Sequence, residues 1–103
     1  MLAAVAVEQE GLEALIPETL AEARYLYFIE LEDGEVQEAL PISGEDGAVQ
    51  ALAARQCRAL ICGQISPAAR QALRQLEVLC FDGYLYQARQ VRRLLYTGVL
   101  PCV

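Results

Sequence analysis

The fold class is decided by the stretch Arg58-Ala-Leu-Ile-Cys-Gly-Gln-Ile-Ser-Pro-Ala-Ala69. Its first five residues form a short apolar run typical of a buried strand, which Gly63 stops. Ser66 and Pro67 then supply an N-cap residue and a first-turn proline, so a helix should follow directly. The stretch therefore predicts a strand, a tight loop and a helix, which is the unit from which parallel sheets are built.

The alternation of strand and helix continues toward the carboxyl terminus. Residues 78–81 predict another buried strand, and Asp82-Gly83 predicts a turn after it. A last helix, closed by Gly98, is predicted from apolar residues at helical spacing, namely Leu85, Ala88, Val91 and Leu95. Strands joined by helices in this way are parallel and connected by right-handed crossovers.

The amino-terminal half adds strands before the first helix. Leu2–Val7 suits an interior strand, Glu8–Glu22 reads as an acidic loop, and Asp33-Gly34 between two apolar runs indicates a hairpin. Ser43-Gly-Glu-Asp46 resembles a capping box and predicts a helix over about residues 46–56. The order of strand, strand, strand, helix, strand, helix, strand, helix predicts one α/β domain over residues 1–103 with a mixed five-stranded sheet.

Composition excludes several classes of protein. Of 103 residues, 55% are hydrophobic and 21% charged, so a mostly disordered chain is excluded. No apolar run approaches the roughly 18 residues of a membrane helix, and no basic region precedes the apolar start, so we expect a cytoplasmic protein without membrane contact. His and Lys are absent, which removes Ser-His-Asp machinery, imidazole ligands and a P-loop lysine, and no nucleophile–base pair is visible. We expect no enzymatic activity.

Charge is divided unevenly along the chain. The net charge of −6 argues against nucleic-acid binding. Residues 1–50 hold twelve acids and one base, whereas residues 51–103 hold two acids and seven bases, all of them Arg. The last helix carries a basic and aromatic face, which we interpret as solvated, formed by Tyr84, Arg89, Arg92, Arg93 and Tyr96.

The loop Cys62–Pro67 is the first candidate site. Unpaired N–H groups at a helix start favour an anion, and Arg70 one turn later could add positive charge. Alternatively, the loop is an ordinary turn between strand and helix, and Ser66 only caps the helix. Cys62 and Cys80 should end neighbouring parallel strands, so their sulfurs could share a soft metal at one sheet edge, or both could simply be buried. Cys57 should point to the opposite face from Cys62, because side chains alternate along a strand.

Read end to end, the chain resembles the dinitrogenase iron-molybdenum cofactor biosynthesis family, the small NifX type of domain. The segment Thr19–Gly34 resembles the family's His-Phe-Gly-Arg-Ala-Pro-Tyr-Phe motif and its Leu-Glu-Asp-Gly hairpin, with Ala23 and Tyr25 matching. Ala59–Ala69 resembles Val-Val-Ile-Cys-Gly-Asn-Ile-Gly-Pro-x-Ala, and Gly98–Pro101 resembles the Gly-x-Leu-Pro tail. The family's ligand histidine is lost, since Thr19 stands at its position.

The resemblance implies a ribonuclease H-like three-layer fold and a non-enzymatic role in nitrogen fixation. That role is binding or carrying a molybdenum- or iron-sulfur cluster, or its anionic thiometalate precursor. Cys62 would then be the sulfur donor, with Cys80 as a second metal ligand and Thr19 at the histidine's place. The anion pocket would be lined by Gly63, Gln64 and Ser66.

A second hypothesis belongs to a different class of function. The chain would be a degenerate family member that binds no cluster and acts as a protein–protein interaction module. Its acidic amino-terminal half and basic last helix would choose a protein partner by charge complementarity.

Overall fold

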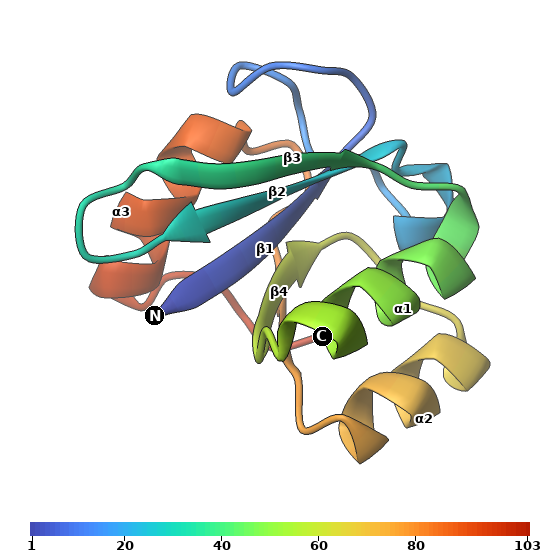
Figure 1. Ribbon diagram of the computed structural model, residues 1–103. Helices are drawn as coiled ribbons and strands as arrows, with labels where there is room; N and C mark the ends of the chain where they lie inside the picture. Colours follow the sequence, from blue (N-terminus) through green and yellow to red (C-terminus); the bar gives the residue numbers. More distant parts are fainter.

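The computed structural model describes residues 1–103 and contains five strands, three α-helices and two short 3-10 turns (Figure 1). The strands are β1 (Leu2–Val7), β2 (Tyr25–Glu30), β3 (Val36–Pro41), β4 (Ala59–Cys62) and β5 (Leu79–Asp82). The helices are α1 (Gly44–Arg55), α2 (Pro67–Gln75) and α3 (Val91–Thr97), and the 3-10 turns are η1 (Leu20–Glu22) and η2 (Ala88–Gln90). The predicted order of strands and helices is confirmed.

The five strands form one mixed sheet in the order β3-β2-β1-β4-β5. β1, β4 and β5 are parallel, as the alternating second half predicts, while β2 is antiparallel to both β1 and β3. The hairpin between β2 and β3 turns at Gly34, whose φ of 76° favours glycine. The mixed α/β sheet is thus confirmed, and the ribonuclease H-like assignment stays a prediction.

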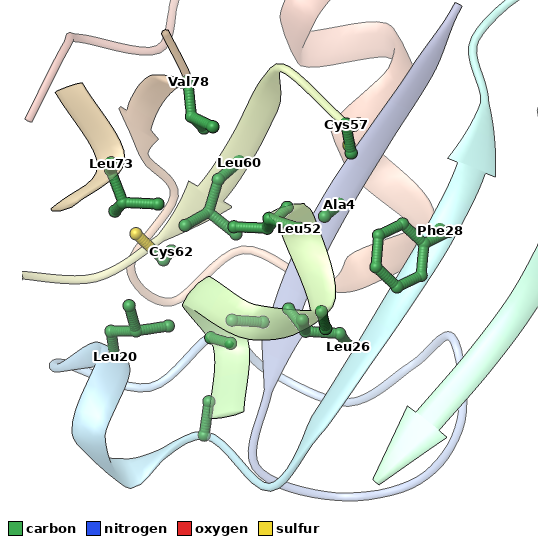
Figure 2. Close-up of a cluster of buried hydrophobic side chains, with 14 residues drawn as sticks. Ala4, Leu20, Leu26, Phe28, Leu52, Cys57, Leu60, Cys62, Leu73 and Val78 are labelled. Atoms are coloured by element: carbon green, nitrogen blue, oxygen red, sulfur yellow. The ribbon is translucent and has the colours of Figure 1, made fainter. Parts of the chain in front are cut away.

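Helices cover both faces of the sheet, so the domain has three layers (Figure 1). Ala4 and Ala6 of β1 face α1 and α2, whereas Ala3, Val5 and Val7 face α3. Each of these residues is fully buried, which explains why β1 is an uninterrupted apolar run and not an alternating one. The core on the α1 and α2 side is drawn in Figure 2.

Two details of the predicted helix starts differ in the structure. The helix predicted over about residues 46–56 is present as α1, with Ser43 at its N-cap position, but the capping box does not form because the Ser43 side chain makes no cap hydrogen bond. Leu85 lies outside the last helix with a φ of 73°, because its N–H donates to the carbonyl oxygen of Ile16 at 3.2 Å. The segment before η2 thus pairs with the loop that follows β1, and this tertiary pairing overrides the helical spacing of the apolar residues.

The two edges of the sheet differ. The carboxyl-terminal tail pairs with β5, where the Asp82 N–H donates to the Pro101 carbonyl at 2.8 Å and the Val103 N–H donates to the Cys80 carbonyl at 3.0 Å. The β3 edge is largely exposed and ends in Pro41. None of the three helices has the length and apolarity that crossing a membrane requires.

Candidate functional site

Loops from distant parts of the chain meet at the carboxyl ends of β1 and β4. The Gln64 N–H donates to the Glu18 carbonyl at 2.7 Å, and the Leu20 N–H donates to the Gln64 carbonyl at 2.8 Å. Thr19 and Gln64 therefore lie side by side as a parallel bridge, so the structure brings these two predicted site residues together. The N–H and the carbonyl of Gln64 are therefore both hydrogen-bonded within the chain.

Gly63 follows β4, as predicted, and is required there because only glycine fits the space. A Cβ atom at this position would lie 2.1 Å from the Glu18 carbonyl oxygen and 2.4 Å from that of Pro17. Its φ is not positive. The glycine therefore allows the loop before η1 to lie directly against the end of β4.

Ser66 caps α2 as predicted, but its remaining polar groups are taken by a residue from α1. Its Oγ accepts the Ala69 N–H at 3.2 Å, donates to Glu45 Oε1 at 2.6 Å, and its own N–H donates to Glu45 Oε2 at 2.9 Å. The half-buried Glu45 carboxylate thus occupies the start of α2, where a helix favours negative charge. This contact of Glu45 has no signal in the sequence, since its first-turn position in α1 suggests only a local role.

The thiol of Cys62 is enclosed by apolar side chains. Figure 2 shows its sulfur among Leu20, Leu60 and Leu73, and no part of the residue is accessible to solvent. Burial raises the pKa of this thiol far above its ordinary value, and the nearby Cys80 and Asp82 add to the rise. Cys62 is therefore a neutral core thiol, whereas a metal ligand must be a thiolate.

The expected sulfur pair lies on neighbouring parallel strands but is offset. Cys80 pairs with Leu60, and the residue opposite Cys62 is Asp82, because β5 continues two residues beyond Cys80. Burial raises the pKa of Cys80 as well. No group of three or more His, Cys, Asp or Glu side chains is arranged to hold a metal ion.

The expectation for Cys57 is wrong. It precedes β4, so strand alternation does not apply to it, and it packs in the same core layer as Cys62. Its thiol donates to the Ala59 carbonyl at 3.4 Å. The two cysteines lie at opposite ends of β4 (Figure 2).

The remaining predicted site residues are also engaged elsewhere. The Thr19 hydroxyl donates to Glu22 Oε1 at 2.8 Å, so the residue at the histidine's place faces a carboxylate. Arg70 lines a small cavity of about 170 Å³ together with Cys80 and Cys102. Its charge therefore acts on Cys80, whose pKa it lowers in opposition to burial.

A polar cleft of about 750 Å³ opens beside this end of the sheet. It lies between the loop after β1, the segment around η1 and the start of α1, where Ser43 provides no side-chain cap. Arg24 supplies a positive charge to the cleft, and Glu8 and Glu22 supply negative ones. Sequence reasoning missed this cleft, whose walls come from three separate segments.

The predicted residues do not fit an anionic metal–sulfur species. The sulfur of Cys62 is buried, and burial raises the pKa of its thiol. The N–H and hydroxyl of Ser66 are bonded to Glu45, and the backbone of Gln64 is paired. A thiometalate at the start of α2 would have to displace a carboxylate that is part of the chain.

The fold and this end of the sheet define a small three-layer α/β domain whose loops meet at the carboxyl ends of its parallel strands. The sequence model described as "Dinitrogenase iron-molybdenum cofactor" matches residues 1–98. The chain belongs to this family. No curated protein matches the sequence.

Solved structures share the fold at low sequence identity. The apo form of the orange protein from Desulfovibrio gigas has a TM-score of 0.81 and 22% identity, covering 97% of this chain and 92% of that one. A putative NifB protein from Thermotoga has a TM-score of 0.79 and 20% identity, with the same coverage of 97% and 92%. A putative dinitrogenase from Methanocaldococcus jannaschii has a TM-score of 0.71 and 14% identity, covering 100% and 96%. These likenesses establish the fold.

Proposed function

We propose that this member of the family is a cytoplasmic, non-enzymatic protein that serves iron-molybdenum cofactor assembly by binding another protein, and that it does not hold a cluster at the predicted residues. One observation carries the proposal: the Glu45 carboxylate fills the start of α2 through two hydrogen bonds to Ser66. The half-buried Glu45 carboxylate and a bound anionic thiometalate exclude each other there by charge as well as by space.

The charge distribution supports a role in protein contact. The loop Glu8–Glu22 carries its carboxylates on the surface, and none of them forms an ion pair within the chain. Exposed charges of one sign guide the approach of a partner of the opposite sign and suppress wrong partners.

The family's own role is a second candidate, favoured by the cleft at the start of α1. There the uncapped helix start and Arg24 could receive an anionic metal–sulfur species without involving Cys62. The substitution Arg24→Gln separates this candidate from the first, because it would weaken cluster binding in the cleft and leave a partner bound elsewhere unaffected.

The proposed function is tested by affinity capture of the tagged chain from its native cells without oxygen, followed by elemental analysis. We expect a protein partner in stoichiometric amount and no molybdenum or iron bound to the chain alone. Molybdenum or iron at about one equivalent per chain, retained after the partner is removed, would contradict the proposal and support the second candidate.

A further inference from the structure

The loops after β1 and β5 expose an unusual number of large apolar side chains. Five of them are between 39% and 60% exposed, and we refer to them together as the apolar platform: Leu12, Leu15, Tyr84, Leu85 and Tyr86. Large apolar groups gathered on the surface of a small domain commonly mark an interaction site.

Backbone hydrogen bonds hold the two loops together. Ile16 and Tyr86 are joined at 2.9 Å, the Ala88 N–H donates to the Ala14 carbonyl at 3.1 Å, and the Arg89 N–H donates to the Leu12 carbonyl at 2.9 Å. Leu15 and Gln87 form a further bridge. The apolar platform is therefore fixed before any partner arrives, which lowers the entropy that binding must overcome.

Leu85 gives the platform a second, independent sign of function. Its φ of 73° is a left-handed conformation that a branched side chain rarely adopts, and its side chain is 60% exposed. The pairing with Ile16 fixes this conformation, which turns the leucine side chain to the surface and not into the core. Residues held in sparsely populated conformations cluster at binding sites.

The charges around the platform define the partner. Glu10 and Glu13 flank Leu12 in the chain, both are exposed, and neither forms an ion pair. Arg89, whose N–H pairs with Leu12, supplies one positive charge to the same loops. Two carboxylates against one guanidinium leave the charge beside the platform net negative, and an apolar surface ringed by arginine or lysine side chains complements it.

We infer that the apolar platform is the docking surface for a partner protein whose contact face is apolar at its centre and basic at its rim. This inference rests on the proposed function and adds the surface and the chemistry of the partner. The platform and the cleft both involve the loop that follows β1, so they lie at the same end of the sheet.

The probe for this inference is a synthetic amphipathic helical peptide with leucines on one face, bordered by arginines. The comparison peptide has glutamates in place of the arginines. Titration into the isotope-labelled chain, followed by amide NMR shifts, should show the arginine peptide perturbing residues 12–16 and 84–88. The glutamate peptide should bind at least about tenfold more weakly.

Variants locate the contact. The double substitution Leu12→Ser with Leu85→Gly should weaken binding of the arginine peptide by at least about tenfold, and Leu85→Gly should leave the fold intact because glycine suits that φ. Leu79→Ser is the matched control: Leu79 is 61% exposed on β5, away from the platform, and its loss should not change binding.

Three results would overturn the inference: equal binding of both peptides, binding of neither, or shifts outside the two loops. A self-association that Leu12→Ser with Leu85→Gly abolishes in sedimentation would make a second copy the occupant and would also overturn it. If the captured native partner binds the double variant with unchanged affinity, the platform is not the docking surface, but the proposed function still holds.

Discussion

The Glu45 carboxylate accepts two hydrogen bonds from Ser66, one from the backbone N–H at 2.9 Å and one from the hydroxyl at 2.6 Å. The contact joins the first turns of α1 and α2, 21 residues apart in the chain. It places the chain's own negative charge where the sequence pattern predicts an external anion.

Removing this carboxylate should both destabilise the chain and open the anion site. Glu45→Ala leaves the N–H and hydroxyl of Ser66 without their acceptor, which should lower the free energy of unfolding by about 2 kcal/mol in urea titrations. Sulfate should then stabilise this variant by binding at the start of α2.

Asp46→Ala is the control for that experiment. Asp46 is exposed and also lies in the first turn of α1, but it makes no hydrogen bond to α2. An equal response of the two variants to sulfate at matched ionic strength would show a general salt effect and no site at Ser66.

Gly63 should not tolerate a side chain. Gly63→Ala would force the Glu18 and Pro17 carbonyls away from the end of β4, because its Cβ would lie 2.1 Å and 2.4 Å from their oxygens. We expect a loss of roughly 3 kcal/mol, measured by thermal unfolding.

The same substitution at Gly47 is a matched control, for which we expect a gain in stability instead of a loss. Gly47 lies inside α1, and an added Cβ would have its nearest contact at 3.6 Å, with Ile42. Gly47→Ala should therefore stabilise the chain by roughly 0.5–1 kcal/mol. Similar melting temperatures for both variants would refute the close approach at Gly63.

The cysteines should differ sharply in reactivity. At about pH 8, iodoacetamide followed by mass spectrometry should label the exposed Cys102 first. Burial raises the pKa of the Cys57 and Cys62 thiols, so both should stay unmodified until the chain unfolds. Rapid labelling of Cys62 in the folded chain would mean that it is available as a ligand after all.

An ion pair between β3 and α1 should make stability depend on acid pH. Arg55 donates two hydrogen bonds to Glu38, at 2.6 and 2.7 Å, and these hold the pKa of that carboxyl below its ordinary 4.5. The stabilisation is therefore present above pH 4.5 and is lost as the pH falls through the lowered pKa.

Glu38→Gln measures this contribution. The variant should be less stable than the natural chain at neutral pH, and the difference should shrink as the pH falls below 4.5 and through the lowered pKa of Glu38. Because both side chains reach solvent, we expect a small effect. A difference that does not change with pH would show that the ion pair is not its source.

Much of the fold could be predicted because its signals are local. β1, β4 and β5 are apolar runs, Ser66-Pro67 and Gly98 mark helix ends by their own chemistry, and the order of elements implies the parallel strands. The spacing of the apolar residues predicts Leu85 inside the last helix. In the structure its backbone pairs instead with Ile16, a residue from a distant loop. Local pattern carries no information about such a partner.

The sequence predicts where the candidate site lies, but not that its polar groups and its thiol are already occupied or buried. The spacing around Gly63 and Ser66 locates the loop, and the family motif brings Thr19 to it. Two features depend on contacts between elements far apart in the chain: Glu45 bonds to Ser66 at the start of α2, and Leu20 and Leu73 pack around Cys62. Those contacts decide whether a ligand can enter.

Anaerobic titration of the metal-free chain with tetrathiomolybdate, followed in the visible spectrum and by co-elution from a sizing column, shows whether Glu45 keeps the anion from the start of α2. The natural chain at about 10 µM should not co-elute with the anion, whereas Glu45→Ala should bind it measurably. Binding of about one equivalent by the natural chain, weakened in Cys62→Ala, would contradict the account and establish the predicted residues as a cluster site.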